Sequence, residues 1–116
     1  MDYSPQRIIC LTEETTETLY LLGEQDRIVG ISGFTVRPPH ARKEKPKVST
    51  FLDAKTDEIL DLKPDLVIGF SDIQANIAKE LIAQGVTVWV NNYRSVEGIL
   101  KMMMQLGVLV DQNEKA

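Results

Sequence analysis

The sequence predicts an α/β fold of three layers, in which a central parallel sheet of four or five strands carries helices on both faces. Short apolar runs typical of buried strands alternate along the chain with amphipathic segments typical of helices. The clearest example is residues 62–70, where a helix ends before Pro64 and an apolar strand follows it. Ligands of such sheets bind beyond the carboxyl ends of the strands, so functional residues are expected there.

Strands are predicted at four places, residues 7–11, 28–31, 66–70 and 86–90. The helix after the first strand begins near Thr12, because Glu13 and Glu14 then lie in its first turn, at the positive end of the helix dipole. Gly23 is a suitable residue for its end. These signals predict one strand–helix unit at the start of the chain.

The later helices are predicted from capping residues. Thr56 begins a short helix that runs to Leu62, and Ser71 with Gln74 has the spacing of a capping box. The helix that Ser71 opens has Ile73, Ile77 and Leu81 on its inner face with Ala78 and Ile82 beside them, and it ends at Gly85. Ser95 begins the last helix, whose predicted inner face is Val96, Ile99, Leu100, Met103 and Leu106.

Residues 32–55 are predicted to be a long connection, since they hold Pro38-Pro39 and Lys45-Pro46. A connection of this length inside a compact domain is usually functional. The basic run at residues 42–47 is interpreted as a solvated loop.

Bulk properties limit the possible functions. The 116 residues suffice for one domain with a core, and a net charge of −4 with a pI near 5.0 argues against nucleic acid as a partner. No apolar run approaches the ~18 residues that a membrane span needs, so membrane insertion is not expected. Cys10 lies in the first strand pattern and is expected to be buried.

The sequence gives little support for an enzyme. It contains no glycine-rich phosphate loop after the first strand, and one histidine with one cysteine cannot form a zinc site. His40 lies among prolines and is expected to be a solvated loop residue. No catalytic or metal-binding residue is therefore predicted.

Three phenylalanines follow predicted strands or lie in the long connection: Phe34, Phe51 and Phe70. They either anchor loops on the core or form an apolar wall for a large ligand. If they form a wall, we expect all three to converge on one concave surface beyond the carboxyl ends of the strands.

Several segments, in order along the chain, together resemble a known family: residues 7–12, 16–23, 26–31, Pro38-Pro39, residues 46–48 and residues 56–68. They resemble the opening of the periplasmic-binding-protein family of ABC importers for cobalamin, ferric siderophores and haem, and they lie closest to its cobalamin-binding branch. The resemblance implies a Rossmann-like lobe at residues 1–107. It also implies that residues 108–116 begin a long helix leading to a second lobe, with the ligand in the cleft between lobes.

The resemblance implies a site for a corrinoid such as cobalamin, with haem or a ferric siderophore as alternatives. The implied ligand-binding residues are Thr12, Phe34, Arg37, Phe51 and Phe70. Phe51 and Phe70 stand where the cobalamin binder has tryptophan, and Arg37 stands where an aromatic residue is usual, so it could suit an anionic ligand. Asp57 falls where the family has a glutamate that docks on an arginine of the membrane permease.

The resemblance implies a periplasmic location. Met1, however, is not followed by a signal-like region, and if Met1 is the native start we expect a cytoplasmic protein. Such a protein would bind a corrinoid without being coupled to transport. Two other classes stay open on architecture: a small α/β enzyme and a response-regulator-like domain, although the third predicted strand ends without the acid that the latter needs. Val108, Leu109 and Val110 are expected to pack on the lobe itself, on a following segment or on another copy of the chain.

Overall fold

A five-stranded parallel sheet forms the centre of the computed structural model, which describes residues 4–33, 35, 37–49, 56–71 and 74–110. The strand order is β3-β2-β1-β4-β5, and all four strand pairs are parallel. The strands are β1 (Ile8–Cys10), β2 (Ile28–Ser32), β3 (Lys47–Ser49), β4 (Leu66–Phe70) and β5 (Val88–Asn91). The predicted α/β class and parallel sheet are therefore confirmed.

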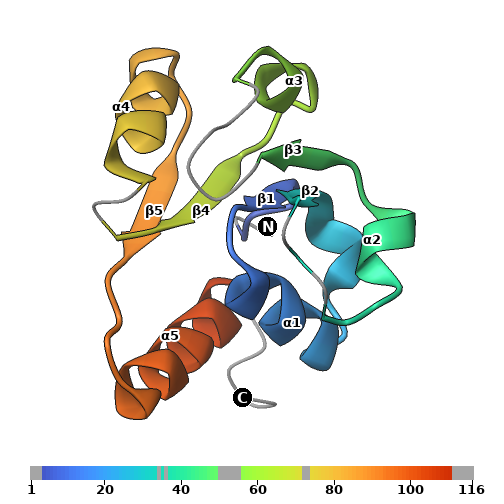
Figure 1. The fold of residues 1–116 in the computed structure, drawn as a ribbon, viewed down its shortest axis with the longest axis vertical. Helices are drawn as coiled ribbons and strands as arrows, with labels where there is room; N and C mark the ends of the chain where they lie inside the picture. Colours follow the sequence, from blue (N-terminus) through green and yellow to red (C-terminus); the bar gives the residue numbers. More distant parts are fainter. Residues whose placement is uncertain (1–3, 34, 36, 50–55, 72–73, 111–116) are drawn as a thin grey trace.

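Helices cover both faces of this sheet, as Figure 1 shows: α1 and α5 lie on one side, and α3 and α4 on the other. The helices are α1 (Glu13–Leu21), α2 (Ala41–Glu44), α3 (Thr56–Asp61), α4 (Ala75–Ala83) and α5 (Val96–Leu109), with a 3-10 turn η1 (Gln25–Arg27) before β2. Among the described helices, none is long and apolar enough to cross a bilayer.

The two faces of the sheet have separate cores because neighbouring residues of a strand point to opposite sides. Ile8 and Cys10 of β1 join the core beneath α1 and α5, whereas Ile9 and Leu11 join the core beneath α3 and α4. Cys10 is fully buried, as expected, and burial raises the pKa of its thiol to about 11.

The connection at residues 32–55 is more structured than predicted. It contains α2 and the edge strand β3, and Ile31 donates its backbone N–H to Pro46 O at 2.9 Å. The basic run is also not a free loop: Arg42 donates to Gly33 O and Thr35 O, and Lys45 Nζ donates to Gln25 O at 2.8 Å. The strand was missed because it is three residues long and begins with a lysine directly after a proline, a composition that edge strands tolerate.

The capping box predicted at Ser71 is wrong. Ser71 has a positive φ of 62°, α4 begins at Ala75, and the Gln74 side chain accepts the N–H of Phe70 rather than that of Ser71. Ile82 was expected near the inner face but is 58% exposed, because α4 turns only Ile77, Ala78 and Leu81 into the core.

The inner face of α5 also differs from the prediction. Met102 and Leu106 are buried, with Ile99 and Met103 packed beside them, whereas an exposed stripe runs at every fourth residue. That stripe is Val96, Leu100, Met104 and Val108.

The end of α5 bears on the expectation for Val108, Leu109 and Val110. Val110 is fully buried and so packs on the lobe itself, while Val108 is 62% and Leu109 is 37% exposed. Because α5 continues without a break to Leu109, no helix boundary lies at Gly107. The division of the chain at residues 107 and 108 stays a prediction.

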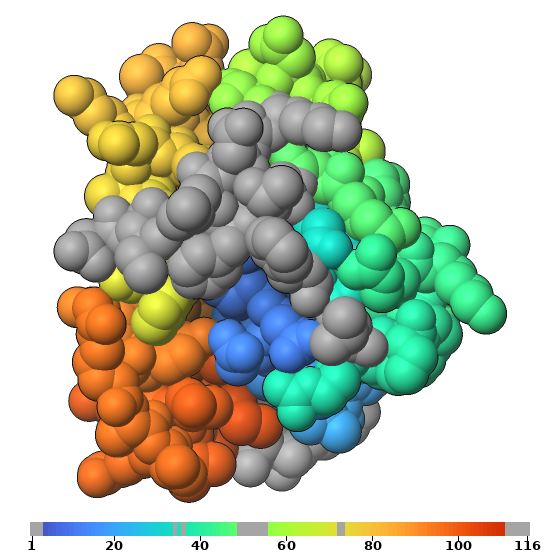
Figure 2. Space-filling model, viewed as in Figure 1, coloured from blue at the N-terminus to red at the C-terminus, as the bar shows by residue number. Residues whose placement is uncertain are grey.

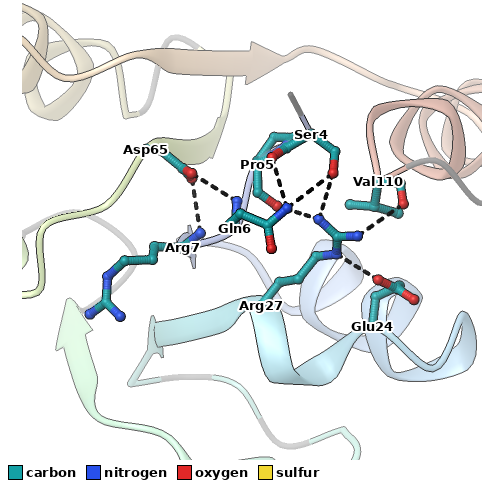
Figure 3. A network of polar contacts seen from close by, with 8 residues as sticks. All are labelled: Ser4, Pro5, Gln6, Arg7, Glu24, Arg27, Asp65 and Val110. Carbon is teal, nitrogen blue, oxygen red and sulfur yellow. Dashed lines mark hydrogen bonds and ion pairs between the residues drawn. The ribbon is translucent and has the colours of Figure 1, made fainter. Parts of the chain in front are cut away.

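Polar contacts tie the amino ends of the strands to both ends of the described chain (Figure 3). Arg27 donates to Ser4 Oγ at 2.8 Å, to Pro5 O at 2.7 Å and to Val110 O at 3.3 Å, and it forms an ion pair with Glu24. Asp65 accepts the backbone N–H groups of Gln6 and Arg7 at 2.8 and 3.0 Å. We call these contacts the amino-edge network.

Candidate functional site

The carboxyl ends of the strands meet at one edge of the sheet because all five strands run in the same direction. Thr12 follows β1, Thr35 follows β2, Phe70 ends β4, and Tyr93 follows β5. Figure 2 shows the blue residues at the start of α1 reaching the surface between the orange segment that leads into α5 and the green α2. We call this surface the carboxyl edge.

Phe70 and Tyr93 form an aromatic pair at the carboxyl edge. Their ring centroids lie 4.7 Å apart with an interplanar angle of 39°. The guanidinium carbon of Arg94 lies 5.9 Å from the centroid of the Phe70 ring, and Arg94 Nη2 donates to Ser71 Oγ at 3.1 Å. This distance permits a cation–π contact. Phe70, Tyr93 and Arg94 together form a partly exposed apolar surface with a cation at its side, and we call them the Phe70 cluster.

The backbone around Phe70 is held from two sides. Phe70 N–H donates to Gln74 Oε1 at 2.7 Å, and Gln74 Nε2 donates to Leu11 O at 3.2 Å, so a buried side chain joins the ends of β4 and β1. Ser71 occupies the left-handed region and donates its N–H to Asn91 O at 2.6 Å. Left-handed conformations of non-glycine residues persist where surrounding contacts hold them, and they are common at ligand sites.

Tyr93 is fixed by α1 and α5. Its hydroxyl donates to Glu14 Oε1 at 3.0 Å. Burial raises the pKa of Tyr93 strongly, the charge of Glu14 and the hydrogen bond to it raise it further, and Thr12 opposes these effects. The phenol therefore stays protonated at neutral pH, and it offers a ring face rather than a tyrosinate ligand.

Gly98 allows α5 to approach Tyr93. A Cβ atom at this position would lie 2.9 Å from Tyr93 Cβ, closer than real Cβ contacts. Ser95 caps the helix at the same place, because its Oγ accepts the N–H of Gly98 at 3.0 Å. The start of α5 thus supports the aromatic pair.

Thr12 lies beneath this surface as the N-cap of α1, as predicted from the sequence. It is 4% exposed, and its Oγ1 lies 2.7 Å from Thr15 Oγ1. Its carbonyl accepts the hydroxyls of Thr15 and Thr16. Because capping already engages the hydroxyl, direct contact of Thr12 with a ligand stays a prediction.

Arg37 lies at the carboxyl edge, but two carboxylates of α1 hold its guanidinium. Arg37 Nη2 is 3.0 Å from Glu13 Oε1, Arg37 Nε is 3.7 Å from Glu17 Oε2, and the Arg37 backbone N–H donates to Glu13 Oε2. The hydrogen bond to Glu13, followed by the charge of Glu17, raises the pKa of Arg37. An anionic ligand would have to compete with both carboxylates for this side chain.

The remaining predicted residues are placed as follows. Phe34 and Phe51 lie outside the described residues, so the predicted convergence of three phenylalanines stays a prediction. Asp57 is exposed in the first turn of α3. His40 is exposed, and its ring meets the Tyr20 ring edge-on at 4.9 Å.

Two shallow apolar hollows lie beside β5, and one of them reaches Ser71, directly after Phe70. One lies between α4 and β5 and is lined mainly by Ala75, Ala78, Ile82 and Val90; the other is lined mainly by Trp89, Val108 and Leu109. Neither is lined by Phe70 or Tyr93. We favour the Phe70 cluster because it lies at the carboxyl ends of the strands and combines aromatic faces with polar donors. In the part of the chain that the structure describes, no group of three or more His, Cys, Asp or Glu residues could hold a metal ion.

Sequence reasoning missed four residues of the carboxyl edge: Gln74, Asn91, Tyr93 and Arg94. Gln74 was predicted to belong to a capping box. Asn91 ends β5, Tyr93 and Arg94 follow it, and no sequence pattern indicated the register of that strand. The signal that could have found Tyr93 and Arg94 is their position between the last predicted strand and the cap Ser95, which is where a parallel sheet presents ligand contacts.

Comparisons with known proteins agree on one family. A family model described as periplasmic binding protein matches residues 8–116. The vitamin B12-binding protein of Vibrio campbellii is 34% identical over 112 residues, which cover 94% of this chain and 40% of that protein. The ABC transporter substrate-binding lipoprotein YvrC of Bacillus subtilis is 29% identical over 116 residues, which cover 97% of this chain and 36% of that protein.

A solved structure from this family of binding proteins has the same fold as the chain. A possible iron-binding (periplasmic solute-binding) protein from Staphylococcus epidermidis superimposes with a TM-score of 0.86 at 27% identity, covering 97% of this chain and 45% of the other. The chain therefore spans about two fifths of the length of the curated relatives it matches. By its sequence match over residues 8–116 and its fold, the chain belongs to the periplasmic binding protein family.

Proposed function

We propose that this chain is the N-terminal ligand-binding lobe of a substrate-binding component of an ABC importer, and that it binds a corrinoid such as cobalamin. The single observation that carries the proposal is the Phe70 cluster, an aromatic surface with polar neighbours at the carboxyl edge. The relative named as a vitamin B12-binding protein supports the choice of ligand class.

The chemistry of a corrinoid fits this surface. Its flat ring needs apolar walls, whereas the amide groups on its rim need scattered polar partners. Phe70 and Tyr93 supply the wall in the proposed site, and Phe34, Phe51, Arg37 and Thr12 are the other proposed contacts. The metal arrives within the ligand, so the protein contributes the ring contacts and the donors.

The chain by itself encloses only part of such a ligand. The Phe70 cluster is open to solvent, and much of a bound corrinoid's surface would stay in water. We therefore expect weak binding by the 116-residue chain, and tighter binding in a longer protein in which a second lobe closes over the ligand.

Asp57 is the proposed contact with the permease. Its carboxylate is exposed in the first turn of α3, where an arginine of a membrane partner could reach it. A periplasmic location follows from this proposal, because an importer collects its ligand outside the cytoplasmic membrane.

Haem or a ferric siderophore is the second candidate ligand, supported by the relative described as a possible iron-binding protein. Both are metal chelates that carry carboxylates or other oxygen acceptors, which the cationic side of the Phe70 cluster would suit. A corrinoid-binding protein not coupled to transport is the further alternative, and it would use the same surface without the Asp57 contact.

Equilibrium dialysis of the 116-residue chain against cyanocobalamin, haemin and a ferric siderophore tests the proposal. We expect saturable binding of cyanocobalamin, and a loss of about tenfold or more in affinity for Phe70→Ala, because burying an aromatic side chain contributes about 1.5–3 kcal/mol. Leu100→Ala is the matched control, since Leu100 is 55% exposed on the outer stripe of α5.

Two results would contradict the corrinoid assignment. One is the absence of saturable cyanocobalamin binding, and the other is an equal affinity of Phe70→Ala and the unmodified chain. Preferential binding of haemin or the ferric siderophore would replace the corrinoid with the second candidate.

A further inference from the structure

We propose that the side-chain amide of Asn91 donates a hydrogen bond to an oxygen on the rim of the ligand that the Phe70 cluster binds. This contact rests on the proposed function, because it lies within the same site. It adds a binding residue that no sequence pattern indicated. It also names a feature that the ligand must carry, which is an oxygen acceptor beside its flat, apolar face.

Asn91 is the last residue of β5 and lies directly beside Phe70. The two residues pair in the parallel register of β4 and β5, so their side chains leave the same face of the sheet, from strands about 4.8 Å apart. The backbone is held at this place, because Asn91 O accepts the N–H of Ser71 at 2.6 Å. A ligand ring stacked on Phe70 would therefore place its rim near Asn91.

The side chain of Asn91 is buried, but its amide nitrogen is unsatisfied. The residue is 9% exposed, and Nδ2 has no hydrogen-bond partner among the described residues. Native proteins pair nearly all of their buried polar groups, and a buried donor without a partner is destabilising. A donor kept in this state in the free protein is explained if a ligand oxygen pairs with it in the bound state.

Two other buried side-chain atoms lack a partner within the described part of the chain, Gln25 Oε1 and Thr35 Oγ1. Gln25 belongs to η1, which leads into the amino end of β2 and so lies at the edge opposite to Phe70. Thr35 follows β2 at the carboxyl edge but is fully buried. Asn91 differs from Gln25 in its place beside Phe70, and from Thr35 in keeping part of its surface exposed.

A small movement suffices for Nδ2 to reach a ligand. The terminal torsion of asparagine is broad, so the amide can turn at low cost while the backbone stays in place. An amide N–H binds carbonyl and carboxylate oxygens alike. The amide oxygens on a corrinoid rim supply such an acceptor, and so do the carboxylates of haem. Asn91 thus selects for an oxygen-bearing rim, whatever the charge of that oxygen.

Titration of the ¹⁵N-labelled 116-residue chain with cyanocobalamin tests the contact directly and needs no variant. The two side-chain N–H signals of Asn91 should shift saturably, in step with the backbone signal of Phe70, because a new hydrogen bond changes the shielding of the donated proton. The side-chain signals of Asn76, which is exposed on α4, should stay in place. Unmoved Asn91 signals at saturation, with the Phe70 signal shifted, would overturn the proposal.

Asn91→Leu separates a binding role from a structural one. Leucine is branched like asparagine but has no donor. We expect the affinity for cyanocobalamin to fall about tenfold, while the melting temperature is no lower than that of the unmodified chain. Asn92→Leu is the matched control, because Asn92 is the next residue and is exposed beside the hollow between α4 and β5. It should bind cyanocobalamin as the unmodified chain does.

The outcomes distinguish this role of Asn91 from the proposed function. A loss of affinity with a lower melting temperature would assign Asn91 to the fold, and equal losses in both leucine variants would assign the effect to added apolar surface; either result overturns the proposal. If Phe70→Ala weakens cyanocobalamin binding but Asn91→Leu does not, the role of Asn91 is wrong and the proposed function stands. If cyanocobalamin does not bind, the proposed function fails and the role of Asn91 fails with it.

Discussion

The two edges of the sheet differ in how far their key side chains are buried. At the amino edge, Arg27 and Asp65 form hydrogen bonds with backbone groups of the chain itself, as Figure 3 shows, so these charged side chains stabilise the fold. At the carboxyl edge, Phe70 is only partly buried and Arg94 is exposed beside it. With binding at the carboxyl edge, as proposed, stability and binding would be separated along the strand direction, and substitutions at the two edges should have different effects.

The largest effect is expected at the amino edge, for Arg27→Ala. Its side chain is only 15% exposed, and its loss removes three hydrogen bonds to the chain ends and the ion pair with Glu24. We expect the free energy of unfolding to fall by about 2–3 kcal/mol. Chemical denaturation followed by circular dichroism measures this change.

Arg94→Gln is the matched arginine substitution at the carboxyl edge. It should lower the free energy of unfolding by about 1 kcal/mol or less, because Arg94 is exposed. An equal loss of stability for the two arginines would break the comparison between the edges.

Gly98→Ala should cost less stability than Arg27→Ala, and it tests how the carboxyl edge is supported. The new methyl group would lie 2.9 Å from Tyr93 Cβ, so Tyr93 or the start of α5 must shift, which would change the packing of Tyr93 on Phe70. The crowding costs about 1–3 kcal/mol, and the better helix propensity of alanine offsets about 1 kcal/mol of it. A net loss near 1 kcal/mol together with weaker nuclear Overhauser effects between Phe70 and Tyr93 is expected. Unchanged ring contacts would show that α5 does not position Tyr93.

The smallest effect is a pH dependence in the alkaline range. Burial and Glu14 raise the pKa of Tyr93 in the folded protein above the value near 10 of an unfolded chain, so the phenol is the form that folding favours. The stability from this group is complete below about pH 10 and is lost as the pH rises towards the folded pKa. Cys10, with its pKa raised to about 11, and Tyr20, with its pKa raised to about 12, act in the same direction.

Tyr93→Phe isolates the contribution of Tyr93. The decline of the free energy of unfolding above about pH 10 should be less steep in this variant than in the unmodified chain, while Cys10 and Tyr20 keep the rest of the decline. Denaturant titrations between pH 8 and about pH 11 measure the two slopes. Identical slopes would show that folding does not raise the pKa of Tyr93.

The fold was predictable from the sequence because its signals are local. The strand at residues 66–70 follows a proline that ends a helix, and both Thr12 and Ser95 cap the helices they were expected to cap. The edge strand β3 was not predictable, because its three residues carry one apolar side chain, Val48, and its pairing with β2 is a long-range contact.

The candidate site was predictable only in part. The position of Phe70 was predictable because Phe70 ends a strand with a clear apolar pattern. Its neighbours in space, Tyr93 and Arg94, lie 23 residues or more further along the chain, after a different strand. The ion pair between Arg37 and Glu13 also joins segments that no sequence period connects. Side-chain partners at a strand edge depend on the register and order of the sheet, and these appear only in three dimensions.

Backbone amide shift mapping with cyanocobalamin is the most direct test of the separation between the edges. ¹H–¹⁵N spectra of the labelled 116-residue chain should show saturable shifts at Phe70, Ser71, Tyr93 and Arg94, and none at Arg7, Arg27 or Asp65. Saturable shifts centred on the amino-edge network, or on the hollow beside Trp89 with none at Phe70, would contradict the assignment of binding to the carboxyl edge.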